Sequence, residues 1–241
     1  MSHAAIVMPI AFGAFLATMV GGLFALSLRD RLHLVLGFSA GAVIGLAFFD
    51  LLPEAVETGG AWGPRTILAL SALGFFLYTL VDRLVLLHSH DGNQHGSETR
   101  GWIGAGSFSA HSLLDGFAIG VGFQASQAVG LTVAIAVLVH DFSDGLNTVN
   151  VVMTNGGERK KALRWLLLDA VAPMIGAGIS LFFVFPKNSL SLILALFAGF
   201  FLYIGASDLL PESQHAHPRF FTTLATLLGA ATLFAAIRIT G

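Results

Sequence analysis

Residues 4–27 read AAIVMPIAFGAFLATMVGGLFALS and contain no charged side chain. A helix of about 20 apolar residues is long enough to cross the hydrocarbon core of a bilayer. The stretch therefore predicts a membrane-spanning helix close to the N-terminus. It is too long for the core of a signal peptide and no Lys or Arg precedes it, so we expect it to stay in the mature protein.

Seven further apolar stretches follow, separated by short charged or turn-rich segments. Of the 241 residues, 55% are hydrophobic and 11% are charged, whereas soluble domains carry about 25% charged residues. Eight spans with short loops occupy nearly the whole chain. We predict an all-α membrane protein in which residues 1–241 form a single transmembrane domain, with spans at about 4–27, 33–52, 66–88, 101–123, 128–154, 162–185, 189–210 and 219–238.

The charge and the cysteine count exclude several classes of partner and site. The formal net charge is -2, so there is no basic surplus to neutralise the phosphates of a nucleic acid. The chain has no cysteine, so a bound metal needs His, carboxylate or amide ligands. The expected partners are the lipid bilayer and divalent metal ions, and a second copy of the chain in a homodimer is a further candidate.

The basic residues are divided unequally between the two ends of the predicted spans. Of the 12 Lys and Arg residues, all but Arg65, Lys187 and Arg238 fall on one side, and this side is expected to be cytoplasmic. With eight spans, both termini then lie outside the cytoplasm, and we expect the cell (inner) membrane. The cytoplasmic loop 88–100 carries three histidines, which are a weak sign of loose metal binding: His88, His90 and His95.

Two polar motifs of one pattern interrupt the fourth and fifth spans. Residues 111–116 read HSLLDG and residues 140–145 read HDFSDG. Charged side chains are costly in the middle of a bilayer, so each needs a partner or a function. In a helix, the histidine and the aspartate four positions later share one face. Because consecutive spans are antiparallel neighbours and both motifs fall near mid-span, we expect the two pairs to meet.

Two imidazoles and three carboxylates without a thiol suit a divalent transition metal. Zn²⁺ is the expected ion, and Fe²⁺, Mn²⁺, Co²⁺ and Cd²⁺ are less selectively accommodated. The alternative is a pair of His–Asp ion pairs that only fix helix packing, but two copies at matching depth favour a metal site. The predicted primary ligands are His111, Asp115, His140 and Asp144, with Ser112 and Asp141 as secondary ligands.

Polar residues continue along the fifth span beyond the second motif. Asn147, Asn150 and Thr154 follow one another at about one per turn toward the cytoplasmic end. We expect this row to form the exit path for the metal. Because metal ligands must be deprotonated, uptake should fall as the pH drops through the titration of the two histidines.

The sequence DLLPE occurs twice, at residues 50–54 and at residues 208–212. The two copies end the second and seventh spans, which point in opposite directions. This predicts an inverted repeat of spans 1–3 and 6–8 around central spans 4 and 5, as in alternating-access transporters. A single copy would equally suit a helix end, where Pro stops the helix. We expect Asp50 and Glu54 to gather cations at the outer mouth, and Asp208, Glu212, His215 and His217 to receive them at the inner one.

Glycines repeat at every fourth residue in two of the predicted spans. Gly37, Gly41 and Gly45 do so in the second span, and Gly116 and Gly120 in the fourth. Helices in lipid associate through close backbone contact over small residues. These glycines are therefore expected to be packing positions.

Over nearly its whole length the chain resembles the ZIP (Zrt/Irt-like) family of divalent metal transporters. The family motif H-[N/S]-x-x-[E/D]-G is similar to residues 111–116, and H-E-x-x-E-G is similar to residues 140–145. The resemblance implies eight spans, extracytoplasmic termini and a His-bearing cytoplasmic loop after the third span. It also implies a metal site of one or two ions that passes metal into the cytosol.

The chain departs from the family pattern at two points. The acids Asp115 and Asp144 are one methylene shorter than glutamate, which is expected to tighten or shift the coordination. In the sixth span the family often has Glu-Pro, whereas this chain has Ala172-Pro173. Asp169, about one turn earlier, is the candidate for the missing ligand.

Three functions are compatible with such a site. Transport of a divalent metal, with Zn²⁺ as the expected substrate, is the leading hypothesis. The alternative is an intramembrane zinc-dependent hydrolase, although residues 140–144 end in Asp, where the protease motif H-E-x-x-H ends in His. A metal sensor or a structural bundle would bind metal without moving it, so metal flux into liposomes separates these functions.

Overall fold

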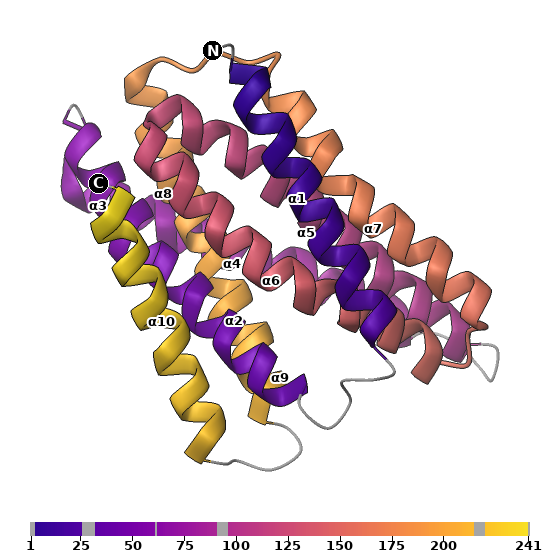
Figure 1. Cartoon of the computed structure of the whole chain (residues 1–241). Coiled ribbons are helices and arrows are strands. Elements are labelled where there is room, and N and C mark those ends of the chain that lie inside the picture. Colours follow the sequence, from indigo (N-terminus) through magenta and orange to yellow (C-terminus); the bar gives the residue numbers. More distant parts are fainter. Residues whose placement is uncertain (1–2, 26–31, 61, 91–95, 215–219, 241) are drawn as a thin grey trace.

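A computed structural model describes residues 3–25, 32–60, 62–90, 96–214 and 220–240, and all regular structure within them is helical (Figure 1). Two short π-helical segments, η2 and η3, interrupt longer helices. In chain order the elements are α1 (His3–Phe24), α2 (Leu32–Leu46), η2 (Ala47–Leu51), α3 (Leu52–Thr58), α4 (Gly63–His90), α5 (Gly96–Ala125), α6 (Gln127–Thr154), α7 (Arg159–Ser180), α8 (Lys187–Tyr203), η3 (Ile204–Leu209), α9 (Leu210–Gln214) and α10 (Phe220–Thr240).

Seven helical segments within the described residues are long and apolar enough to cross a membrane. The expected fourth span, at about 101–123, lies in α5, which has 30 residues but is not among these seven segments. Besides its polar motif, this stretch contains Ser107, Ser109 and six glycines, which lower its hydropathy. The chain is therefore an all-helical, multi-span membrane protein. The seven segments are His3–Phe24, His33–Thr58, Gly63–Leu84, Gln127–Thr154, Arg159–Ser180, Lys187–Gln214 and Phe220–Ile239.

The two copies of DLLPE do not end their helices, so this part of the sequence prediction is wrong. The second span continues through η2 into α3, and the seventh continues through η3 into α9. Pro53 and Pro211 lack the backbone N–H that a helix interior requires. In both copies a π-turn ends two residues before the proline and locally widens the helix, which lets the chain stay helical.

The helices on either side of the predicted loop 88–100 extend into it. α4 extends to His90 and α5 begins at Gly96. Several predicted metal contacts cannot be placed here, because they lie outside the described residues: the side chains of His88 and His90, and the whole of His95, His215 and His217.

The helices pack as two groups. α1, α5, α6 and α7 pack mainly against one another, and so do α2, α4, α8 and α10. In Figure 1, α2 and α10 lie side by side at one flank, α1 and α7 lie at the other, and α6 runs between them. Contacts of α6 with α2 and of α5 with α4 join the groups. Both polar motifs, on α5 and α6, therefore lie in one group and face the other.

Glycines set the close contacts within these groups. A Cβ atom on Gly116 would overlap the carbonyl oxygen of Pro173, and one on Gly176 would overlap that of Leu113. These two contacts press α5 against α7. Gly41 meets the backbone of α10 in the same way. The packing role predicted for the glycines is confirmed at Gly41 and Gly116, where no side chain would fit.

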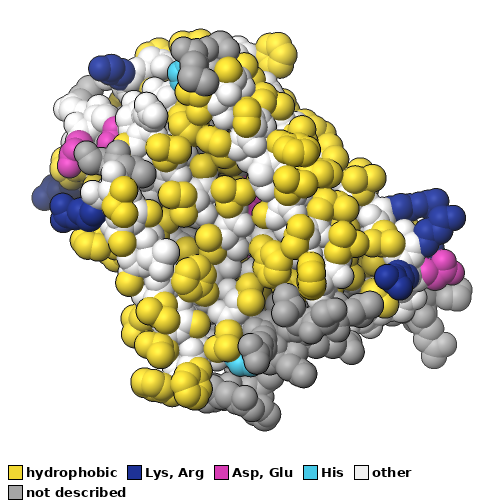
Figure 2. All heavy atoms as spheres, viewed as in Figure 1, with side chains coloured by type: hydrophobic (Ala, Val, Ile, Leu, Met, Phe, Trp, Pro, Cys, Tyr) yellow, Lys and Arg dark blue, Asp and Glu magenta, His cyan; other side chains and the backbone are white. Residues whose placement is uncertain are grey.

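The outer surface is largely apolar. Figure 2 shows hydrophobic side chains over most of the visible face, with Lys and Arg gathered toward its ends. Large side chains such as Phe76 and Leu227 are 66% and 63% exposed. An apolar surface of this extent is unusual on a soluble monomer and suits contact with lipid.

Candidate metal site

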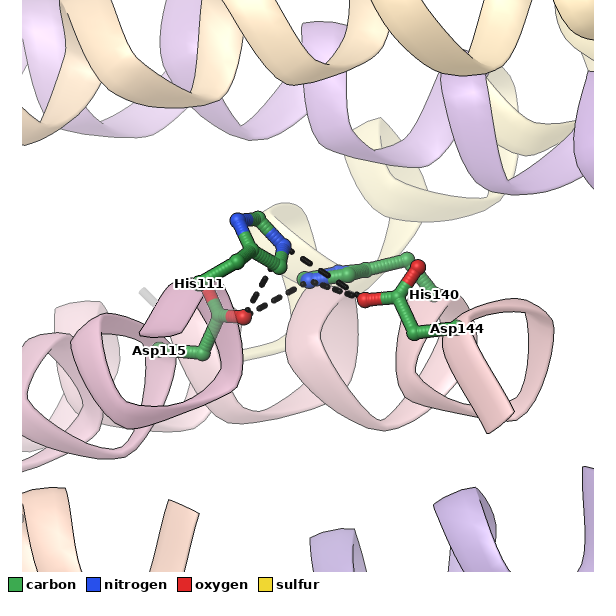
Figure 3. A group of neighbouring side chains, drawn as sticks. All are labelled: His111, Asp115, His140 and Asp144. Atoms are coloured by element: carbon green, nitrogen blue, oxygen red, sulfur yellow. Dashed lines mark hydrogen bonds and ion pairs between the residues drawn. The ribbon is translucent and has the colours of Figure 1, made fainter. Parts of the chain in front are cut away.

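Four side chains from α5 and α6 converge in the protein interior (Figure 3). His111 and Asp115 come from α5, and His140 and Asp144 come from α6. All four are buried, and one potential ligand atom of each lies within 4.8 Å of the others. The structure thus brings together the four residues that the two sequence motifs singled out as primary ligands. We call them the His/Asp cluster.

The two imidazoles face the two carboxylates across the cluster. Oδ2 of Asp115 lies 3.1 Å from Nε2 of His111 and 3.3 Å from Nε2 of His140. Oδ2 of Asp144 lies 3.4 Å and 3.9 Å from the same two nitrogens. Two nitrogens and two carboxylate oxygens around one point form a donor set that Zn²⁺ accepts in tetrahedral geometry.

In each imidazole ring, the nitrogen that does not face the carboxylates also has a hydrogen-bond partner. Nδ1 of His140 lies 2.8 Å from the carbonyl oxygen of Ala136, and a carbonyl only accepts, so Nδ1 carries the hydrogen. In the neutral ring this leaves the lone pair of Nε2 facing the cluster. Nδ1 of His111 lies 3.0 Å from the hydroxyl of Tyr78 on α4. Partners of this kind fix the orientation of metal-binding histidines.

Sequence reasoning missed Tyr78, although the composition held a signal for it. The chain has 21 phenylalanines but only 2 tyrosines. The second one, Tyr203, packs against Tyr78 with 5.1 Å between ring centroids. A rare hydroxyl in so apolar a chain marks a position where a polar partner lies nearby.

Asp141 lies next to the cluster without a hydrogen bond. It is completely buried, and neither carboxylate oxygen has a hydrogen-bond partner among the described residues. Its Oδ1 lies 3.8 Å from Nε2 of His140. A buried carboxylate without hydrogen bonds is costly, and a cation beside it would remove most of this cost.

Asp169 and Ser112 form a second polar contact beside the cluster. Oδ1 of Asp169 accepts a hydrogen bond of 2.8 Å from Ser112, and Oδ2 accepts one of 2.7 Å from Thr148. All three residues are buried. Asp169 is therefore not among the four converging side chains, and both of its oxygens bind hydroxyl groups that join α7 to α5 and α6. Thr148, one turn after Asp144 on α6, was not predicted.

A cavity of about 460 Å³ opens beside His111 and Asp144. Its wall includes Asp208 and also Asp82, whose Oδ2 accepts a 2.7 Å hydrogen bond from Tyr203. The remaining lining includes Arg83, Arg100, Ile103, Gly104, Ser107, Phe108, Val151 and Asn155.

The predicted exit row on α6 does not line this cavity. The wall contains Asp144 and Val151 of α6 and Asn155 directly after this helix. Asn147 is buried, and its side-chain amide has no hydrogen-bond partner among the described residues. Asn147, Asn150 and Thr154 therefore lie outside this cavity wall, and their role as an exit path stays a prediction.

The remaining predicted metal contacts lie outside the His/Asp cluster. Asp50 belongs to η2, and its Oδ2 is buried without a hydrogen-bond partner among the described residues. Glu212 belongs to α9 and is exposed. Glu54 lies in α3, beyond the π-turn that holds Asp50.

A multi-span helical membrane protein with a buried cluster of two histidines and two aspartates at the base of a cavity belongs to the class of intramembrane cation-binding proteins. The sequence model described as ZIP Zinc transporter matches residues 86–236. This match covers more than half of the chain and includes all four cluster residues. The chain belongs to the ZIP zinc transporter family.

Individual relatives agree with this assignment. The zinc transporter ZupT of Corynebacterium efficiens is 28% identical over 247 residues, which cover 92% of each chain. ZupT of Corynebacterium glutamicum is 29% identical over 225 residues, or 83% of this chain and 86% of the relative. The zinc transporter ZIP10 of Homo sapiens is 32% identical over 141 residues, which cover 53% of this chain and 17% of the relative. Membership of this family places the chain among transporters rather than enzymes, so the hydrolase alternative loses its support.

Proposed function

We propose that this protein transports zinc across the membrane into the cytosol and binds it in transit at the His/Asp cluster. The observation that carries the proposal is the convergence of four ligand atoms within 4.8 Å in the buried interior. The names of the two ZupT relatives, which this chain matches over most of their length, describe zinc transporters. Their substrate is the one that the donor set of the cluster suits best.

The ion and the buried carboxylates stabilise one another. Asp115, Asp141 and Asp144 are each at most 2% exposed, and three acidic groups so close together repel one another when ionised. A dication offsets both this repulsion and the loss of water. Fe²⁺, Mn²⁺, Co²⁺ and Cd²⁺ accept the same ligands and are proposed as weaker substrates.

The surrounding polar residues act as secondary contacts in this proposal. Asp141 has two unpaired oxygens beside the cluster and is the first candidate for a further ligand. Ser112 and Asp169 already bind each other, and both oxygens keep lone pairs that a metal can accept. They are therefore proposed as contacts for a second metal position.

The cavity beside His111 is the proposed exit path. It contains Arg83 and Arg100, which lie on the side richer in basic residues, and the basic side of a membrane protein is generally cytoplasmic. Asp208 in the cavity wall and Glu212 beyond it then receive the metal on the inner side, and Asp50 belongs to the entrance. Both termini are extracytoplasmic in this orientation, and we expect the inner membrane.

We further propose that the chain works as one transmembrane domain of eight spans over residues 1–241, with α5 as the fourth span. The shared transition from a π-turn to an α-helix in both copies of DLLPE supports an inverted repeat of spans 1–3 and 6–8 around spans 4 and 5. A homodimer stays a prediction.

Zinc flux into liposomes tests the function. Purified protein is reconstituted with a zinc-sensitive dye inside the vesicles, and wild type is compared with the double variant His111→Ala, Asp144→Ala. We expect the double variant to fall to the rate of protein-free vesicles. His33→Ala on α2, which removes an imidazole outside the cluster, is the matched control and should keep the wild-type rate.

The other outcomes separate the remaining functions. A correctly folded double variant that takes up zinc as fast as wild type would show that the cluster is not the transport site. Zinc binding by wild type without any flux would identify a sensor or a structural site instead of a transporter.

A further inference from the structure

A second pocket, which shares no residue with the His/Asp cluster, lies at the start of α7. It has a volume of about 390 Å³ and is formed by side chains of α5 and α7. Two of the three tryptophans of the chain take part in it. The residues that line it are Trp102, Lys161, Arg164, Trp165 and Leu168.

The pocket carries a positive charge that the protein does not fully neutralise. Lys161 forms an ion pair with Glu98 and lies 5.5 Å from the centre of the Trp102 ring. Among the described residues, no carboxylate lies within ion-pair distance of Arg164. Arg159 and Lys160 precede the pocket on the same helix. The guanidinium of Arg164 is therefore available to an anion from outside the chain.

The position of the pocket matches the boundary between lipid headgroups and hydrocarbon. On α7, Leu163, Leu167 and Leu168 are 39%, 50% and 58% exposed, so an apolar surface begins directly beside the basic residues. Figure 2 shows Lys and Arg side chains gathered where α7 begins in Figure 1, at the edge of the hydrophobic surface. Tryptophan is enriched at this level of a membrane because its ring is apolar and its N–H is polar.

We propose that this pocket binds the headgroup of an anionic phospholipid. Arg164 and Lys161 bind the phosphate, since a guanidinium forms paired hydrogen bonds with phosphate oxygens. Trp102, Trp165 and Leu168 pack against the glycerol and the upper acyl chain. Basic pockets between transmembrane helices are known to bind acidic headgroups. The proposal requires a membrane protein, but it does not depend on zinc transport.

Such a lipid would join the two helices that also meet beside the metal site. Trp102 belongs to α5 and Arg164 to α7, and the same helices are joined in the interior by the hydrogen bond between Ser112 and Asp169. A bound lipid thus adds an outer contact to this pair of helices, at the end where α7 begins.

Quenching of tryptophan fluorescence by brominated lipid tests the proposal. Trp62→Phe is introduced first, so that only the two pocket tryptophans emit. The protein is reconstituted into phosphatidylcholine bilayers that contain increasing fractions of either dibrominated phosphatidylglycerol or dibrominated phosphatidylcholine. We expect the anionic brominated lipid to reach half-maximal quenching at a clearly lower fraction than the zwitterionic one.

Two matched variants test whether the preference for anionic lipid depends on the charges inside the pocket. Lys161→Gln with Arg164→Gln removes two charges inside the pocket, and Arg159→Gln with Lys160→Gln removes two charges from the same turn outside it. A basic residue near a headgroup contributes about fivefold in binding, so we expect the pocket variant to raise the half-quenching fraction at least that much. The outer variant should raise it clearly less. Arg164→Gln against Arg159→Gln gives the same comparison if the double variants do not fold.

Three outcomes would overturn the proposal. Equal quenching by the two brominated lipids would show no preference for an anionic headgroup. Equal losses in the two double variants would show diffuse attraction to surface charge instead of a pocket. Relief of the quenching by inorganic phosphate would show a site for free phosphate and not for lipid. None of these quenching measurements uses zinc. Their result therefore does not depend on whether the protein transports zinc.

Discussion

The hydroxyl of Tyr78 lies 3.0 Å from Nδ1 of His111 and connects α4 to the α5 half of the His/Asp cluster. When Nε2 of His111 binds a metal, Nδ1 of the neutral ring carries the hydrogen. The tyrosine oxygen then accepts this hydrogen and holds the ring in the orientation that the metal needs. Tyr78 thereby joins one helix group to the metal site of the other.

Loss of this contact should weaken zinc binding without removing a ligand. Tyr78→Phe keeps the ring and deletes only the hydroxyl, and we expect the Kd for zinc to rise about 10- to 100-fold, as is typical for partners of metal-binding histidines. Isothermal titration of the purified protein measures it. Tyr203→Phe is the control, because its hydroxyl binds Asp82 and no cluster residue. An unchanged Kd in Tyr78→Phe would contradict the role of the hydrogen bond.

Zinc should stabilise the folded protein through Asp141. At a zinc concentration of 100 times the Kd, binding adds about 2.7 kcal/mol to the free energy of unfolding. Asp141→Asn removes a buried carboxylate without hydrogen bonds, so we expect the metal-free variant to be at least as stable as wild type and the zinc-induced rise in Tm to be smaller. Thermal unfolding with zinc and with a chelator measures both. A metal-free variant that is clearly less stable than wild type would mean that the contact of Asp141 with His140 stabilises the metal-free fold.

Close packing of α7 on α5 should be required for the site. Gly176→Ala places a Cβ against the carbonyl oxygen of Leu113, and overpacking of this kind typically costs about 1–3 kcal/mol. Because it forces apart the helices that carry Ser112 and Asp169, zinc affinity should fall as well. Gly178→Ala is the control on the same helix, since no atom lies within 4 Å of its added Cβ. Equal stability of the two variants would refute this account.

Reactivity of an introduced cysteine should reveal the side on which the cavity opens. The chain has no cysteine, so Ser107→Cys in the cavity wall is a unique reporter. We expect a membrane-impermeant thiol reagent to modify it from the cytoplasmic side only. Ser71→Cys on α4, a position that is 4% exposed, should stay unmodified. Modification of Ser107→Cys from the outer side alone would reverse the proposed orientation.

The His/Asp cluster was predictable because it depends on local geometry. The spacing of His111 and Asp115, repeated at His140 and Asp144, puts each pair on one helix face, and antiparallel neighbours bring such faces together. Tyr78 and Thr148 were not predictable in the same way. Their roles depend on how α4 and α7 pack against the cluster, which no spacing within one helix encodes.

The helix ends and the cavity wall show where sequence rules are insufficient. Proline normally stops a helix, but the π-turns before Pro53 and Pro211 accommodate it, and the sequence carries no simple pattern that indicates a π-turn. The cavity beside His111 meets the face of α6 that carries Asp144 and Val151, and the polar row that begins at Asn147 lies outside its wall. The rotation of α6 about its axis is set by packing, and the sequence alone left it open.

Because η2 and η3 are π-helical, the orientation of the side chains that follow them depends on the number of residues in each segment as well as on their identity. Each extra residue in a turn shifts all later side chains by about 100° around the helix axis. A deletion of one apolar residue in either segment would restore regular α-helix and turn Glu54 or Glu212 toward a different neighbour, although every acid is still present. In-frame loss of a single codon there is therefore expected to be more harmful than most substitutions at the same positions.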